Sequence, residues 1–93
     1  MKRFPKLLKA AEGTPCMNYG SVGTTVAAHA NEIIYGKGIG IKAHDAATAH
    51  LCHICHARLD NGNDLTKQER FIFWHRAYVK TMIYRFDMGI IRV

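Results

Sequence analysis

The chain has 93 residues and a mass of 10.5 kDa, enough for one domain and too little for a second hydrophobic core. Hydrophobic residues make up 48% of the chain and charged residues 22%, which excludes an intrinsically disordered protein. Thirteen Lys and Arg against seven Asp and Glu leave a net charge of +6, and this surplus predicts a polyanionic partner, above all nucleic acid.

The first predicted element is a short amphipathic helix over residues 4–12, where apolar side chains recur at helical spacing. Pro5 suits its first turn and Gly13 suits its end. A turn-rich segment follows, and the β-branched residues at 24–26 then predict a strand. We expect His29 to lie at the end of that strand.

Two further helices are predicted after a glycine-rich loop. Residues 36–42 contain too much glycine for regular structure, and residues 50–59 favour helix. Thr66 and Glu69 match the capping box, which predicts a long third helix at about 67–88. Large apolar residues recur along this helix and are expected to form the core. They are Phe71, Ile72, His75, Tyr78, Val79, Met82, Ile83 and Phe86.

The three cysteines predict a metal site. Their odd number in a chain without an export signal argues against a disulfide framework. Cys52 and Cys55 are three apart at a predicted helix start, where both thiolates can reach one tetrahedral ion. Together with Cys16 in the early turn they match the two halves of a treble-clef site for structural zinc. The fourth ligand stays open: it is His50, His53 or a water, or the site has no fourth ligand.

Two other interpretations of these cysteines stay open. Residues 52–56 also spell Cys-x-x-Cys-His, the attachment motif of c-type haem. Haem attachment normally requires export, and Lys9 and Glu12 interrupt the N-terminal segment before it reaches the length of a signal peptide. The haem interpretation would also leave Cys16 unexplained. Alternatively, all three thiols are ordinary buried core groups.

The order of these motifs resembles that of the HNH (His-Me finger) nucleases, and more closely a phage and prophage branch of small nucleases, the YbcO-like family. The resemblance covers residues 13–62 and joins Cys16, the strand-end His29, the glycine-rich loop with Lys-Ala-His-Asp at 42–45, and Leu-Cys-His-Ile-Cys-His at 51–56 with Leu59-Asp60. The loop and the cysteine segment are also similar to RecA-dependent nucleases of the Ref type.

The resemblance implies a small α+β fold, a treble-clef or ββα-metal HNH domain with an N-terminal helix and a long C-terminal helix. We expect one HNH-like nuclease domain over residues 1–93, with its motif core at 13–62. Residues 90–93 are apolar enough to add a short terminal strand.

The resemblance also implies roles for individual residues. His29 matches the general base that takes a proton from the attacking water. Asp45 falls near the middle position that ties the loop to the base, although an Asp before two alanines also suits a helix N-cap. His56 matches a ligand of the catalytic divalent ion, such as Mg²⁺, Mn²⁺ or Zn²⁺. Hydrolysis of a phosphodiester needs this pairing of an activated water with charge stabilisation.

The glycine-rich loop is the predicted phosphate-binding element. Lys37 and Lys42 would hold nonreacting phosphates, together with backbone N–H groups at Gly38 and Gly40. Glycine permits a close approach of the backbone to the ligand. The plainer interpretation is a flexible turn with two solvated lysines.

The sequence thus predicts a metal-dependent endonuclease that hydrolyses DNA phosphodiesters, in phage- or prophage-related recombination. Its expected partners are DNA and a recombination protein, and a homodimer could cut both strands. No apolar run approaches the roughly 20 residues of a membrane span, so we expect a protein of the bacterial cytoplasm. Ala28 stands where many HNH enzymes carry a metal ligand. A noncatalytic zinc module that binds DNA or a protein is therefore the alternative.

Overall fold

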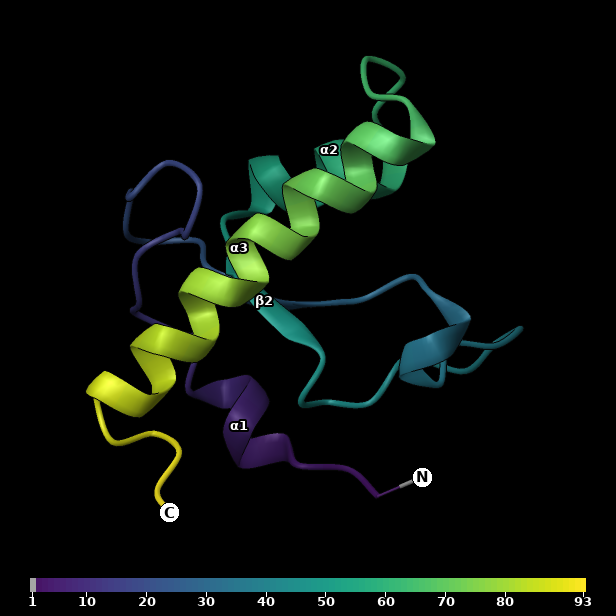
Figure 1. The fold of residues 1–93 in the computed structure, drawn as a ribbon. Coiled ribbons are helices and arrows are strands. Elements are labelled where there is room, and N and C mark those ends of the chain that lie inside the picture. The colour runs from purple at the N-terminus through teal and green to yellow at the C-terminus, as the bar shows by residue number, and fades with distance from the viewer. Residues whose placement is uncertain (1) are drawn as a thin grey trace.

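The computed structural model describes residues 2–93 and shows a small α+β fold built around a two-stranded sheet. The elements in chain order are α1 (Pro5–Lys9), β1 (Val26–His29), the 3-10 helix η1 (Ile33–Tyr35), β2 (Thr48–Leu51), α2 (His53–Asn61) and α3 (Lys67–Asp87). In Figure 1, α3 crosses diagonally in front of β2, and α1 lies below them. The prediction of an α+β fold with an N-terminal helix and a long C-terminal helix is confirmed.

The two strands form an antiparallel pair, with Val26 opposite Leu51 and His29 opposite Thr48. The sequence predicted β1 but not β2, because residues 50–59 were expected to be helical. The strand carries the polar and apolar alternation Thr48-Ala49-His50-Leu51, which the sequence analysis overlooked, although all four residues are buried. Pairing with β1 decides the conformation here, and α2 begins only at His53.

The ends of the other two helices follow local rules. In the capping box of α3, the N–H of Glu69 donates to Thr66 Oγ1 (3.1 Å) and the N–H of Thr66 donates to Glu69 Oε1 (2.9 Å). The predicted start of this helix is confirmed. The α1 helix is shorter than the predicted 4–12, because from Ala11 onward the hydrogen bonds span three residues, as in a 3-10 turn.

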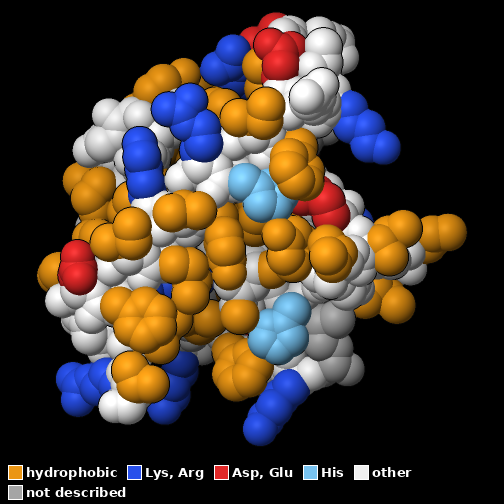
Figure 2. Space-filling view, viewed as in Figure 1, with side chains coloured by type: hydrophobic (Ala, Val, Ile, Leu, Met, Phe, Trp, Pro, Cys, Tyr) orange, Lys and Arg blue, Asp and Glu red, His pale blue; other side chains and the backbone are white. Residues whose placement is uncertain are grey.

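The face of α3 that packs on β2 differs from the prediction. The large apolar stripe is largely exposed, with 51% of Phe71, 56% of Val79 and 57% of Ile83 accessible to solvent. Figure 2, viewed from the same side, shows apolar side chains gathered over α3. The buried positions are instead Trp74, Ala77, Thr81 and Arg85. The expectation that the stripe forms the core is wrong.

Small and hydrogen-bonded side chains select the buried face of α3. Thr81 Oγ1 accepts the N–H of His50 (2.9 Å), and the Trp74 indole donates to the carbonyl of Ala28 (2.9 Å). Ala77, between them, lets the helix approach the sheet closely. Arg85 is fully buried and donates to Thr48 Oγ1 (2.6 Å). These bonds satisfy polar groups that a layer of large apolar side chains would leave unpaired.

The end of the chain closes α3 and adds no strand. The N–H groups of Ile90 and Ile91 both donate to the carbonyl of Arg85, at 2.8 and 3.1 Å. Such bonds satisfy the last carbonyls of a helix. The prediction of a terminal strand at 90–93 is therefore wrong. Among residues 2–93, no helix has both the length and the apolar character to cross a membrane.

Candidate active site and metal centre

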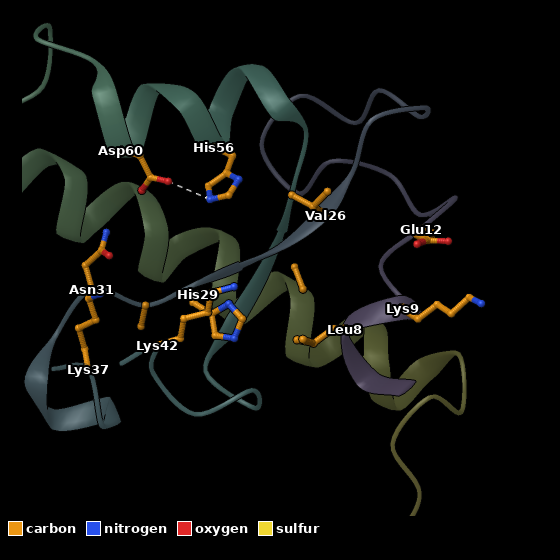
Figure 3. Close-up of a pocket in the computed structure, with 12 residues that line it drawn as sticks. Leu8, Lys9, Glu12, Val26, His29, Asn31, Lys37, Lys42, His56 and Asp60 are labelled. Atoms are coloured by element: carbon orange, nitrogen blue, oxygen red, sulfur yellow. Dashed lines mark ion pairs between the residues drawn. The ribbon is translucent and has the colours of Figure 1, made fainter. Parts of the chain in front are cut away.

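A groove of about 770 Å³ lies between α1, the end of β1 and α2. His29 reaches it from β1 and His56 from α2, and Figure 3 shows the two rings facing the same space. Lys37 and Lys42 of the glycine-rich loop also line the groove. The fold thus brings together two histidines and two lysines that the sequence analysis selected from separate segments.

The alternation of β1 directs His29 into the groove. Successive side chains of a strand point to opposite faces, so Ala28 and His29 face different sides of the sheet. Ala28 is only 1% exposed and lies in the core beside Trp74. Position 28, where many HNH enzymes carry a metal ligand, contributes no side chain to this groove.

Asp45 is hydrogen-bonded to the Nε2 nitrogen of His29. Its Oδ1 accepts the Nε2–H of His29 at 2.9 Å, so in the neutral imidazole Nδ1 is the nitrogen that can accept a proton. No helix follows Asp45, because residues 48–51 form β2, so it does not act as a helix N-cap. The carboxylate is 1% exposed and sets the tautomer and orientation of the histidine.

The N-terminal segment completes the surroundings of Asp45. Arg3 donates to Asp45 Oδ1 (3.0 Å), and the N–H of Phe4 donates to Oδ2 (2.7 Å). Burial would raise the pKa of Asp45, but the hydrogen bonds from His29, Phe4 and Arg3 outweigh it and lower the pKa to about 2. Arg3 also donates to the carbonyls of Ala43 and Lys42. The sequence analysis missed Arg3, because no local pattern relates it to a loop 40 residues away.

His56 has a neighbour to which the sequence analysis gave no role. Asp60, one turn later on α2, places Oδ2 3.0 Å from His56 Nε2. Both side chains are partly exposed and line the groove, as Figure 3 shows. The i,i+4 spacing on a predicted helix was the signal that could have found this pair. An imidazole nitrogen and a carboxylate on one helix face can together bind a divalent cation.

The three cysteines form a buried cluster away from solvent. The Sγ atoms of Cys16, Cys52 and Cys55 lie within 4.8 Å of one another, and those of Cys16 and Cys55 are 3.8 Å apart. Tetrahedral coordination with Zn–S bonds of about 2.3 Å separates two sulfurs by about 3.8 Å. The cluster therefore could bind a metal such as zinc.

Local hydrogen bonds act differently on the thiols. Burial would raise the pKa of Cys16, but backbone N–H groups at Tyr19, Cys52 and Asn18 outweigh it and lower that pKa. Burial raises the pKa of Cys55 to about 12, although the amide of Asn18 lies 3.5 Å from its sulfur and favours the thiolate. A bound cation would reverse the shift at Cys55, because thiols that ligate a metal lose their protons.

The remaining histidine candidates lie outside this cluster. Within residues 2–93, no fourth His, Cys, Asp or Glu atom joins the three sulfurs. His50 Nδ1 donates instead to Thr14 Oγ1 (3.2 Å), and burial followed by the charge of Arg85 lowers the pKa of His50 to about 4. His53 is exposed at the start of α2.

The glycine-rich loop borders the groove as a tight turn. Gly38 and Ile41 exchange backbone hydrogen bonds of 3.0 and 3.1 Å, and Gly40 adopts a φ of 68° that favours glycine. Gly40 lines a second hollow together with His29 and Asp45. Gly38 lines neither this hollow nor the main groove.

The burial of Cys52 and Cys55 argues against the haem interpretation. Both thiols point into the core beside Cys16, whereas covalent attachment needs sulfurs that reach the edge of a porphyrin. His56, which would have to ligate the iron, instead faces the groove beside Asp60. The two cysteines of the Cys-x-x-Cys-His motif therefore lie in the core, whereas its histidine lies in the groove.

The fold is similar to a solved structure described as "a putative bacteriophage protein" from Escherichia coli K-12. The two chains are 21% identical with a TM-score of 0.66, and the match covers 89% of this chain and 99% of the other. No family model matches the sequence, and no curated protein matches it. At this level of identity the likeness shows the fold alone. The chain therefore shares its fold with a phage-related protein.

Proposed function

We propose that this protein is a metal-dependent endonuclease of the HNH type that hydrolyses DNA phosphodiesters. One observation carries the proposal: His29 and His56 line the same groove, with Asp45 hydrogen-bonded to the Nε2 nitrogen of His29. This arrangement supplies a base on one side of a phosphodiester and a cation ligand on the other.

In the proposed reaction, His29 acts as the general base. Its Nδ1 takes a proton from a water while the water oxygen attacks phosphorus, and the bond from phosphorus to the leaving sugar oxygen breaks. Asp45 keeps the Nε2–H in place and stabilises the imidazolium that forms. A divalent cation held by His56 and Asp60 would stabilise the negative charge on the phosphate oxygens.

The charge distribution supports a nucleic acid as the substrate. Lys37 and Lys42 line the groove beside the two histidines, and the whole chain carries a net charge of +6. Lysines at such positions bind the phosphates on either side of the one that reacts.

A noncatalytic zinc module that binds DNA or a protein is the second candidate function. The position of Ala28 favours it, because the side chain before the base lies in the core. In the groove, β1 then offers no side chain for a cation besides the base His29, and α2 offers His56 and Asp60. Two protein ligands are few, although Mg²⁺ commonly keeps several waters and needs only one or two carboxylates.

A plasmid-nicking assay tests the proposal. We expect purified protein to convert supercoiled plasmid to the nicked form with Mg²⁺, Mn²⁺, Ni²⁺ or Zn²⁺, and His29→Ala to slow this about 10²–10⁴-fold. His53→Ala is the matched control, because it removes an exposed histidine outside the groove. Nicking that survives His29→Ala, or DNA binding with no cleavage under any of these metals, would favour the second candidate.

A further inference from the structure

The turn that joins Lys37 to Lys42 carries an apolar tip. Ile39 is fully exposed and Ile41 is 53% exposed. The two hydrogen bonds between Gly38 and Ile41 close the turn, and the positive φ of Gly40 lets the chain reverse within these four residues. A large apolar side chain is thus presented to solvent at the tip of an ordered turn.

The base of this turn is anchored to the body of the protein. Tyr35 accepts the N–H of His44 with its carbonyl (2.8 Å), and its hydroxyl donates to His75 Nε2 on α3 (2.9 Å). The Tyr35 ring also lies against Trp74, with ring centroids 5.8 Å apart. Figure 1 shows the segment between β1 and β2 projecting from the body, on the side away from the loop between α1 and β1 that carries Cys16. An anchored base can hold the exposed tip in one position when it meets a ligand.

The tip lies at the rim of the candidate active site. Lys37 and Lys42, on either side of the turn, line the main groove with His29. Gly40 and Ile41 line the second hollow, of about 480 Å³, which also contains His29. A DNA strand with its phosphate against His29 would therefore bring its neighbouring bases to the turn.

We propose that Ile39 is a wedge that enters the DNA minor groove and partly unstacks one base step beside the phosphodiester that is cut. This inference rests on the proposed nuclease function and names its substrate class: duplex DNA that is flexible or already unstacked at that step. Isoleucine is one of the apolar side chains that proteins insert between base pairs in this way. Pyrimidine–purine steps and mismatched pairs cost least to open.

The charges around the turn favour DNA over a protein surface as the occupant. Residues 36–44 carry two lysines and no acidic residue. The lysines can neutralise phosphates on both sides of the inserted step, while the isoleucine contacts the bases. Insertion also removes the apolar tip from water, which offsets part of the cost of unstacking.

Fluorescence of 2-aminopurine tests the wedge. The probe is placed at successive steps of a short duplex, and binding is followed by anisotropy in a His29→Ala background that does not cleave. We expect the parent to raise the fluorescence at one or two adjacent steps. Ile39→Ala should abolish this rise and weaken binding to an intact duplex about tenfold. A duplex mismatched at that step should lose less affinity.

Ile34→Ala is the matched control. Ile34 belongs to the same projecting segment and is 84% exposed, but it lines a different hollow, with Tyr78 and His44. We expect it to leave both signals unchanged. An unstacking signal that persists in Ile39→Ala, or an equal loss in Ile34→Ala, would overturn the wedge and point to a protein partner for these isoleucines.

The wild-type nicking assay separates this inference from the proposed function. If wild-type protein nicks plasmid and Ile39→Ala still unstacks DNA, the wedge is wrong and the nuclease stands. If wild-type protein unstacks DNA through Ile39 but never nicks it, the nuclease is wrong and the wedge stands as part of a DNA-binding module. Absence of any DNA binding would overturn both.

Discussion

The cysteine cluster and the histidine groove both use residues of α2 and differ in their exposure to solvent. The cluster is closed: Cys16 is 2% exposed and Cys55 is fully buried. The groove is open, and the side chain of His56 is 38% exposed. Cys55 and His56 are adjacent in sequence, so two faces of the same helical turn carry the buried cluster and the exposed groove.

This contrast teaches how one short helix can serve structure and chemistry at once. A buried set of thiols suits an ion that holds the fold, because its binding energy becomes folding energy. An exposed imidazole and carboxylate suit an ion that must exchange waters and meet a substrate. If the contrast is functional, changes in the cluster should alter stability first, and changes in the groove should alter activity alone.

Removal of a thiol should have the largest effect. We expect Cys55→Ser to lose cooperative unfolding and bound zinc, since apparent zinc-binding energies of about 10–16 kcal/mol exceed the total stability of a small domain. Circular dichroism during a thermal scan, with elemental analysis of the same sample, measures both. A folded, metal-free wild type would remove the assignment of the cluster to structural zinc.

Loss of the groove ligands should abolish activity without unfolding the protein. We expect His56→Ala and Asp60→Ala each to lower the nicking rate at least 10²-fold, while the thermal midpoint stays within a few degrees. Asp60→His should retain activity and shift the metal preference toward Ni²⁺ or Zn²⁺, because imidazole suits these ions. Arg58→Ala, on the same helix but outside the groove, is the control. An unfolded His56→Ala protein would break the contrast.

Asp45→Asn should affect both properties to an intermediate degree. An amide cannot hold the protonated nitrogen of His29 and Arg3 in the same way, so we expect nicking to fall about 10–10²-fold and the free energy of unfolding to fall by about 1–3 kcal/mol. Initial nicking rates and urea denaturation at neutral pH give the two values. Wild-type rates in Asp45→Asn would remove its positioning role.

The lowered pKa of Asp45 also predicts how the stability of the protein changes with pH. That pKa is about 2 in the folded protein against an ordinary value of 3.8, so the unfolded chain binds the proton more tightly. The stability contributed by Asp45 is complete above about pH 4 and is lost as the pH falls toward 2. The difference in unfolding free energy between wild type and Asp45→Asn should shrink over this range, since carboxyl groups distant from Asp45 titrate alike in both proteins. A constant difference would contradict the assignment.

The smallest effect is expected for the lysines of the loop. Lys37→Ala and Lys42→Ala should each weaken DNA binding a few-fold and reduce the slope of log affinity against log salt by about 0.9, one phosphate contact per lysine. Anisotropy titrations between about 50 and 200 mM salt measure the slope. Lys80→Ala, on the far element α3 and outside the groove, should leave the slope unchanged.

Local signals in the sequence predicted the elements whose causes are local. The capping box at Thr66 and Glu69 is satisfied by atoms three residues apart, so it can be recognised without any other part of the chain. The exposed stripe of α3 shows the limit of this approach. Helical spacing correctly predicts a helix, but which face becomes buried depends on bonds from Trp74 and Thr81 to strands that lie far away in sequence.

The candidate site divides in the same way. The resemblance to the HNH nucleases singled out His29, Asp45 and His56, and the spacing of the three cysteines singled out a metal site. The bonds of Arg3 to Asp45 became visible only in three dimensions, whereas the i,i+4 spacing of His56 and Asp60 was already present in the sequence. Side chains of ordinary surface types have no local pattern that distinguishes a partner in a site from a solvated charge.

By itself, the amino-acid sequence determined the basic charge, the helix boundaries set by capping and the residues able to bind protons or metals, because each depends on a side chain and its near neighbours. Only the tertiary structure decided that β2 exists, that α3 buries Thr81 and Arg85, and that two histidines share one groove. Those outcomes depend on the pairing of distant segments, whose free energy comes from packing and hydrogen bonds that no single stretch of the chain contains.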